Sequence, residues 1–223
     1  MVLAKGKYTY SGSGKYLKLP KPIKICGQGI GETILDGFGL YIQGSKSNGS
    51  VVIEDLTIQG GKGKGLWAYE GMDLIVRRCK VEKCQYHGVN ADNAHISCED
   101  VQVVGCVLNG VYAYQGGTVK LSGENTRIEG NVTNGNSRNY GLTAWDSFSK
   151  IQIVTPLTKD TISTNNGGGG RFDTSRRYGA RSVGAQWNGS DCQTMQSREV
   201  SELWCDCDQR THLLRRRPSG WLW

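Results

Sequence analysis

The sequence predicts an all-β chain that winds as a single-stranded parallel β-helix, with about 22 residues and three strands in each coil. A motif of Gly, an aliphatic residue, any residue and Ala recurs as GLWAY, GVNAD, GVYAY and GLTAW, beginning at Gly65, Gly88, Gly110 and Gly141. Between these motifs, apolar residues alternate with polar ones in short bursts of period two. Thirty-two Gly and four Pro, with frequent Val, Ile, Tyr and Thr, favour strands and tight turns over helices.

The repeat divides the middle of the chain into four units, at residues 51–72, 74–94, 96–117 and 119–145. Each unit contains three bursts of alternation, which predict three strands. The fourth unit has extra loop residues near Gly123–Asn125 and Gly135–Tyr140. One unit cannot bury its apolar side alone, so we expect five to six coils to stack at a spacing of about 4.8 Å. The motifs of leucine-rich repeats are absent, and a propeller blade would need about twice this period.

The segment ICGQGIGETILDG (25–37) resembles an early coil of the parallel β-helix family that includes pectin-lyase-like folds and the β-helix repeats of some F-box proteins. Asn131 occupies the repeat position held by Gly61, Cys84 and Cys106, which also matches that family. The resemblance covers residues 20–165. It implies a right-handed coil, in line with the general preference for right-handed crossovers. It does not fix the activity, because this scaffold carries lyases, hydrolases, epimerases and proteins without catalysis.

Three regions follow from this pattern. Residues 1–20 are a basic lead-in or cap, residues 21–165 form the β-helix, and residues 166–223 are a Gly-rich linker followed by an irregular segment rich in Cys, Trp and Arg. Two hypotheses stay open for the last segment. Either it covers the open end of the solenoid, or it is disordered or even the product of an altered reading frame.

Composition narrows the function classes. No apolar run has the length of a signal peptide or a membrane span, so we expect an intracellular protein whose organelle is open. The net charge is +7, but the excess Lys and Arg gather at the chain ends, so we expect no specific nucleic-acid binding. The chain has eight Cys, and the five that lie within the repeat are expected to be reduced core thiols. Cys84 and Cys106 fall on adjacent coils within disulfide range, so whether they are bonded is open.

Opposite charges align on neighbouring coils. Glu54, Arg77 and Glu99 occupy one repeat position, and Asp55, Arg78 and Asp100 occupy the next. Pairs of opposite charge on adjacent strands stabilise their register. We therefore interpret both columns as structural ladders and not as a catalytic cluster.

The repeated motif also predicts a surface. If its aliphatic and Ala positions point inward, the alternate residues form an exposed aromatic strip on one sheet: Trp67, Tyr69, Asn90, Asp92, Tyr112, Tyr114, Thr143 and Trp145. Aromatic side chains with polar groups between them suit the anchor residues of a protein partner, and they also suit sugar rings. A third reading is that the rings only pack against one another.

Catalysis is poorly supported by the residue pattern. Asp92 and His95 are the best catalytic candidates, but Asp92 has no nearby carboxylate partner for hydrolysis. We expect no cofactor and no metal site, although a lyase-like activity would bring in Ca²⁺. The sequence therefore favours a non-catalytic recognition scaffold that binds a protein partner, alone or as a subunit of a larger assembly. The alternative is a carbohydrate-active protein, lyase-like, epimerase-like or polysaccharide-binding, that uses the same face.

Overall fold

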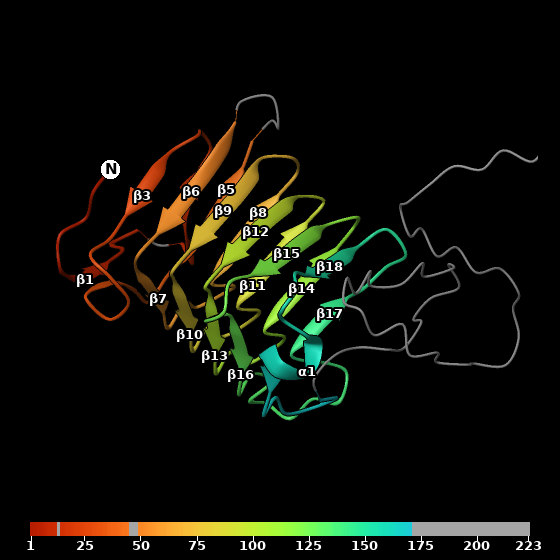
Figure 1. Cartoon of the computed structure of the whole chain (residues 1–223). Coiled ribbons are helices and arrows are strands. Elements are labelled where there is room, and N and C mark those ends of the chain that lie inside the picture. Colours follow the sequence, from red (N-terminus) through yellow and green to blue (C-terminus); the bar gives the residue numbers. More distant parts are fainter. Residues whose placement is uncertain (13, 45–48, 171–223) are drawn as a thin grey trace, which may run out of the picture. The chain divides into compact units, whose positions relative to one another are not determined.

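The computed structural model describes residues 1–12, 14–44 and 49–170, which form three parallel β-sheets (Figure 1). One sheet contains β1 (Gly6–Thr9), β4 (Thr33–Asp36), β7 (Thr57–Gln59), β10 (Lys80–Glu82), β13 (Gln102–Val104), β16 (Arg127–Glu129) and β19 (Ser163–Thr164). The aromatic sheet contains β2 (Tyr16–Leu19), β5 (Gly39–Gln43), β8 (Leu66–Tyr69), β11 (Val89–Asp92), β14 (Val111–Tyr114) and β17 (Leu142–Ala144). The charged sheet contains β3 (Lys24–Cys26), β6 (Ser50–Glu54), β9 (Asp73–Arg77), β12 (His95–Glu99), β15 (Thr118–Ser122) and β18 (Lys150–Ile153). A short helix, α1 (Lys159–Ile162), precedes β19.

The chain visits the three sheets in turn, so each coil contributes one strand to each sheet. Trp67 on β8, for example, pairs with Asn90 on β11, which lies 23 residues further along the chain. Figure 1 shows β6, β9, β12 and β15 side by side in sequence order. This arrangement confirms the predicted parallel β-helix with three strands per coil.

The core lies between the three sheets and runs through all the coils. In the first three of the four motifs, the inward positions have no exposed surface, namely Leu66, Ala68, Val89, Ala91, Val111 and Ala113, whereas Ala144 of the fourth motif is partly buried. Inward side chains from the other two sheets join the same hydrophobic cluster. Because burial of apolar surface is the main favourable term in folding, this stack of aliphatic columns holds the coils together.

The motif glycines are required by close contact between adjacent coils. The backbone N–H of Gly65 donates to the carbonyl of His87, and the N–H of Gly88 donates to the carbonyl of Asn109, each at 3.0 Å. A Cβ atom on Gly88 would lie 2.9 Å from the Gly110 carbonyl oxygen and would collide with Val103. Any larger residue would therefore push the coils apart at the turn that leads into the aromatic sheet.

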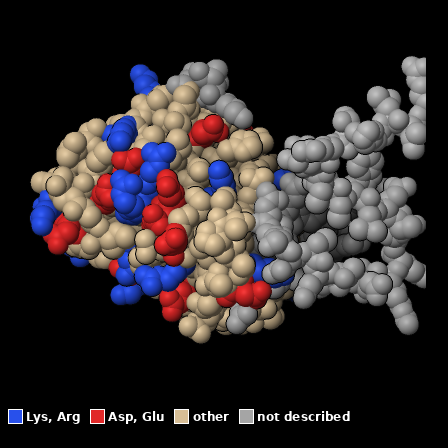
Figure 2. All heavy atoms as spheres, viewed as in Figure 1, with Lys and Arg blue, Asp and Glu red and all other residues tan. Residues whose placement is uncertain are grey.

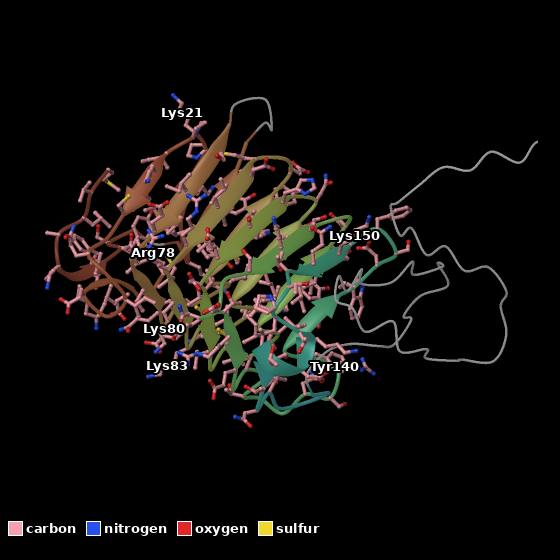
Figure 3. All side chains as sticks on the ribbon, viewed as in Figure 1. Lys21, Arg78, Lys80, Lys83, Tyr140 and Lys150 are labelled. Carbon is pink, nitrogen blue, oxygen red and sulfur yellow. The ribbon has the colours of Figure 1, made fainter. Side chains whose placement is uncertain are left out.

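The ends of the solenoid differ from the simple repeat. Residues 1–20, expected to lead into or cap the solenoid, contain β1 and β2, which pair with β4 and β5. The predicted insertion before Tyr140 is a loop between β16 and β17, and the Tyr140 N–H donates to Asn109 Oδ1 at 2.6 Å (Figure 3). Asn131 is buried, accepts a hydrogen bond from the Cys106 N–H and donates to the Val103 carbonyl. Most of the C-terminal segment, residues 171–223, lies outside the described residues.

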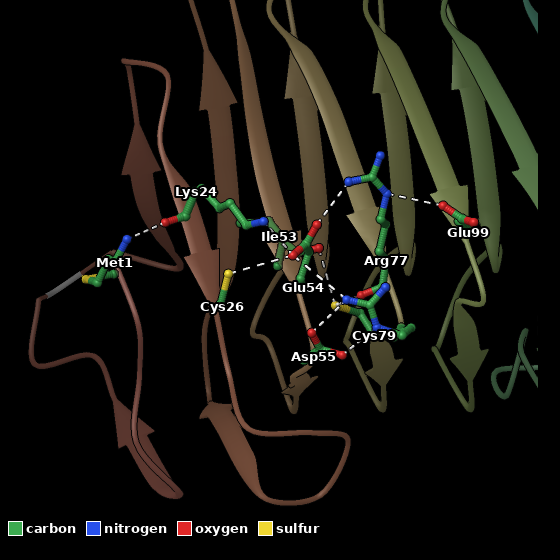
Figure 4. Close-up of polar contacts among 10 residues, drawn as sticks. Met1, Lys24, Cys26, Ile53, Glu54, Asp55, Arg77, Cys79 and Glu99 are labelled. Atoms are coloured by element: carbon green, nitrogen blue, oxygen red, sulfur yellow. Dashed lines mark hydrogen bonds and ion pairs between the residues drawn. The ribbon is translucent and has the colours of Figure 1, made fainter.

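The outer face of the charged sheet carries the predicted ladder of opposite charges. Arg77 bridges Glu54 and Glu99, with N–O distances of 3.0 and 3.1 Å (Figure 4). Lys24 extends the ladder to the next strand, 2.9 Å from Glu54. Positive and negative side chains accordingly interleave on this face (Figure 2).

The second charged column is only partly paired. Arg78 forms two hydrogen bonds with Asp55, at 2.7 and 2.8 Å. Asp100 instead accepts from the backbone N–H of Asn125, because the loop at Gly123–Asn125 folds over it. The predicted minus–plus–minus column thus ends after its first pair.

The five cysteines among the described residues are free thiols. Cys79 and Cys98 are buried in inward columns, and burial raises the pKa of each thiol to about 12. Cys84 and Cys106 are also fully buried, and they contact each other through a hydrogen bond. Their thiols are therefore not joined as a disulfide in this structure.

Candidate functional site

The predicted strip occupies the outer face of the aromatic sheet. Trp67 and Tyr69 come from β8, Tyr112 and Tyr114 from β14, and Trp145 follows β17. These five rings are half-buried, whereas the strip was expected to be exposed. The shorter polar residues of the strip, Asn90, Asp92 and Thr143, are buried. The difference arises because taller side chains on neighbouring coils cover the shorter ones.

The rings form two clusters. In the first, Trp67 lies 4.4 Å from Tyr41, 5.6 Å from Tyr16 and 5.9 Å from Tyr69, measured between ring centroids. In the second, Tyr112 is joined by ring contacts to His87, Tyr114 and Trp145. Strand β11 runs between the two clusters, since it pairs with β8 on one side and β14 on the other. Its outward residues, Asn90 and Asp92, therefore form a polar row flanked by aromatic side chains.

Unpaired polar atoms concentrate on this face. Among the described residues, six buried side-chain atoms lack a hydrogen-bond partner, and five of them belong to this sheet or the turn before it: Trp67 Nε1, His87 Nδ1, Asn90 Nδ2, Asp92 Oδ1 and Thr143 Oγ1. Leaving a buried polar atom unpaired costs about 1–3 kcal/mol. Native folds keep few such atoms, so their concentration here marks the best candidate site in the described part of the chain.

Lys64 brings a positive charge to the polar row from the turn that precedes β8. Its backbone N–H donates to the Tyr16 hydroxyl at 2.9 Å, which fixes the turn against β2. Its ammonium lies 3.6 Å from the centre of the Trp67 ring, a cation–π contact. Burial lowers the pKa of the amine to about 8, and the nearby Asp92 carboxylate opposes that shift.

His87 and Asp92 are the other titratable groups beside Lys64. The His87 ring stacks on Tyr112, with centroids 4.4 Å apart and an interplanar angle of 7°. Burial, assisted by the Lys64 charge, lowers the pKa of His87 to about 3, so the imidazole is neutral at pH 7. Burial also raises the pKa of Asp92, while Lys64 and the Trp67 indole lower it. Burial thus disfavours the charged forms of Lys64, His87 and Asp92.

The structure does not bring together the pair suggested by the sequence. Asp92 ends β11 on the aromatic sheet, whereas His95 begins β12 on the charged sheet and is exposed. The groups that shift the Asp92 pKa include Lys64 and Trp67 but not His95. Two strands that meet at a sharp corner point their outward side chains in different directions, and this separates the two residues.

The described residues offer no evident metal centre. In residues 1–12, 14–44 and 49–170, no three His, Cys, Asp or Glu side chains gather as metal ligands. Ca²⁺ requires several oxygen ligands, and the polar row supplies one carboxylate, Asp92. The residues of the site therefore do not fit the calcium ion that a lyase-like activity would bring in.

Sequence reasoning missed four members of the site: Tyr16, Tyr41, Lys64 and His87. The segment GLYIQ (39–43) follows the same Gly-aliphatic frame as GLWAY, so extending the repeat toward the N-terminus could have found Tyr41, which pairs with Trp67. Lys64 and His87 each directly precede a motif glycine. No periodicity reveals that such turn residues fold back over the sheet.

Three parallel sheets and a stacked repeat define a solenoid built from β-strands, with its candidate site on one sheet face. A family model described as "Right handed beta helix region" matches residues 31–155, more than half of the chain. The chain belongs to this family. No curated protein and no solved structure showed a significant match. Among the described residues, no helix is long and apolar enough to cross a membrane.

Proposed function

We propose that the chain is a recognition scaffold that binds a partner protein through the outer face of its aromatic sheet. The observation that carries the proposal is the placement of unpaired buried polar atoms between two aromatic clusters. Protein interfaces place Trp and Tyr anchors at their centre and supply hydrogen-bond partners to polar groups there. The charged sheet, where Lys24 and Arg77 pair with Glu54 and where Asp73 Oδ1 is the one unpaired buried side-chain atom among the described residues, gives less support for such a role.

A comparative pull-down tests this proposal. The wild-type chain is compared with Trp67→Ala/Tyr112→Ala, which removes one ring from each cluster, and with Arg78→Ala/Lys120→Ala on other surfaces as the matched control. We expect the same specific partner to be recovered with the wild type and the control and lost with the aromatic variant. Recovery of that partner with the folded aromatic variant would refute the proposal.

A second candidate is a carbohydrate-active protein that uses the same face. The observation in its favour is that Lys64, with a pKa of about 8, lies near Asp92, whose pKa is raised by burial. Groups with pKa values moved toward neutrality suit proton transfer, and aromatic faces suit sugar rings. Specific binding on a glycan array that is lost in Trp67→Ala/Tyr112→Ala would favour this candidate. Lyase and epimerase assays with Asp92→Asn as the control would then follow.

A further inference from the structure

We infer that the partner segment bound at this face is an extended peptide with an acidic side chain, whose carboxylate pairs with Lys64. The inference rests on the proposed protein-binding function and adds the chemistry of the partner. It follows from the charge of Lys64, from the unpaired amide donor of Asn90 and from the spacing of the side chains.

Lys64 holds a charge that the described residues do not neutralise by direct contact. Its ammonium lies on the Trp67 ring and makes no ion pair within 4.0 Å in the described part of the chain. Lys24, by contrast, lies 2.9 Å from Glu54 on the charged sheet. Asp92 acts on Lys64 through space without forming such a pair. An incoming carboxylate would therefore find a partly desolvated cation with free donors.

A further donor belongs to the same cluster. The amide Nδ2 of Asn90 is buried and lacks a hydrogen-bond partner, whereas the Trp67 indole interacts with Asp92 and lowers the pKa of that carboxyl. A carboxylate accepts several hydrogen bonds through its two oxygens. One acidic side chain could thus pair with the ammonium and also satisfy an unpaired donor, which a neutral side chain would do less well.

The geometry of the polar row favours an extended peptide. Asn90 and Asp92 lie two residues apart on β11, a distance of about 6.6 Å, which is also the repeat of side chains along one edge of an extended chain. Strands β8 and β14 lie one coil away on either side of β11, so their aromatic rows are about 9.6 Å apart. An extended segment running along β11 would contact both clusters while its acidic side chain reaches Lys64.

Titration of the labelled protein with two hexapeptides tests the inference. Both are acetylated and amidated; one alternates threonine with glutamate, and the other alternates threonine with glutamine. Binding is followed by the shift of the Trp67 indole N–H resonance, assigned by its loss in Trp67→Phe. We expect the glutamate peptide to bind at least tenfold more tightly than the glutamine peptide. Lys64→Gln should abolish that preference, whereas Lys64→Arg and the exposed control Lys120→Gln should retain it.

The outcomes separate the inference from the proposed function. Equal binding of both peptides, or a preference that survives Lys64→Gln, would overturn the acidic-segment inference and leave protein binding intact. Binding of neither peptide would also overturn the acidic-segment inference. The pull-down with Trp67→Ala/Tyr112→Ala would still test the proposed protein-binding function independently. A Lys64-dependent shift with oligogalacturonate but with neither peptide would overturn the peptide inference and favour the carbohydrate candidate.

Discussion

The charged sheet and the aromatic sheet are built from the same coils, yet they differ in how they pair buried polar side chains. Among the described residues, Asp73 Oδ1 on β9 is the one unpaired buried side-chain atom of the charged sheet, against five on the aromatic sheet and the turn before it. On the charged sheet, Glu54 is buried and receives ion pairs from Lys24 and Arg77. On the aromatic sheet, Asn90 is equally buried, but its amide nitrogen has no partner. A buried polar group that is paired stabilises the register of a fold, whereas an unpaired one costs free energy. The comparison indicates that polar pairing on the charged sheet stabilises the fold, and it supports the proposal that the aromatic sheet binds a partner.

Both faces depend on the turns that set the spacing of the coils, and Gly88→Ala tests that dependence most severely. The new Cβ would meet Val103 and the Gly110 carbonyl in the neighbouring coil. We expect a loss of about 2–3 kcal/mol in the free energy of unfolding, because overpacking at a rigid contact forces the backbone to move. Urea denaturation measures the loss. A change below about 0.5 kcal/mol would show that the coils can separate without cost.

Glu54→Ala tests the claim that the charged face stabilises the fold. The substitution removes the shared acceptor of Lys24 and Arg77 and leaves Arg77 with Glu99 alone. We expect a loss of about 2 kcal/mol, at the upper end for a hydrogen-bonded charge whose partners remain partly solvated. The more exposed pair Arg78 and Asp55 provides the control, since Asp55→Ala leaves Arg78 its 3.8 Å contact with Glu54 and should cost less than about 1 kcal/mol. Equal effects at the two positions would contradict the role assigned to Glu54.

The aromatic face should respond to acid through His87. Its folded-state pKa of about 3 lies below the ordinary value of 6.5, so the unfolded chain binds a proton first as the pH falls. Stability from this group is thus full above pH 6.5 and is lost progressively toward pH 3, by up to ~1.4 kcal/mol for each pH unit. His87→Gln should flatten the dependence of the unfolding free energy between pH 6.5 and 5. The exposed His95→Gln is the control, and an unchanged slope in His87→Gln would refute the assignment.

The fold could be predicted well from the sequence because the same short residue pattern occurs in several consecutive coils. The pairs Leu66/Ala68, Val89/Ala91 and Val111/Ala113 alternate with period two, and their motif glycines set the coil length, so strands and inward columns followed directly. The ladder at Glu54, Arg77 and Glu99 was predictable for the same reason.

The candidate site was predicted only in part. The strip from Trp67 to Trp145 followed from alternation. The predicted pairing of Asp92 with His95 was wrong, because the chain turns a corner between the two residues and places them on different sheets. Lys64 and His87 reach the site from turns, and the direction of a turn side chain depends on contacts with other coils, such as that of His87 with Tyr112. Period-two reasoning carries no information about those contacts.

The free energy of unfolding of Asn90→Ala, measured by urea denaturation beside the wild type, tests the central claim most directly. Because the Asn90 amide nitrogen is buried without a partner, the account predicts a change within about 0.5 kcal/mol in either direction, even though the residue is almost fully covered. A loss of about 2 kcal/mol, equal to that expected for Glu54→Ala, would show that Asn90 stabilises the fold. The contrast between the two faces would then be wrong.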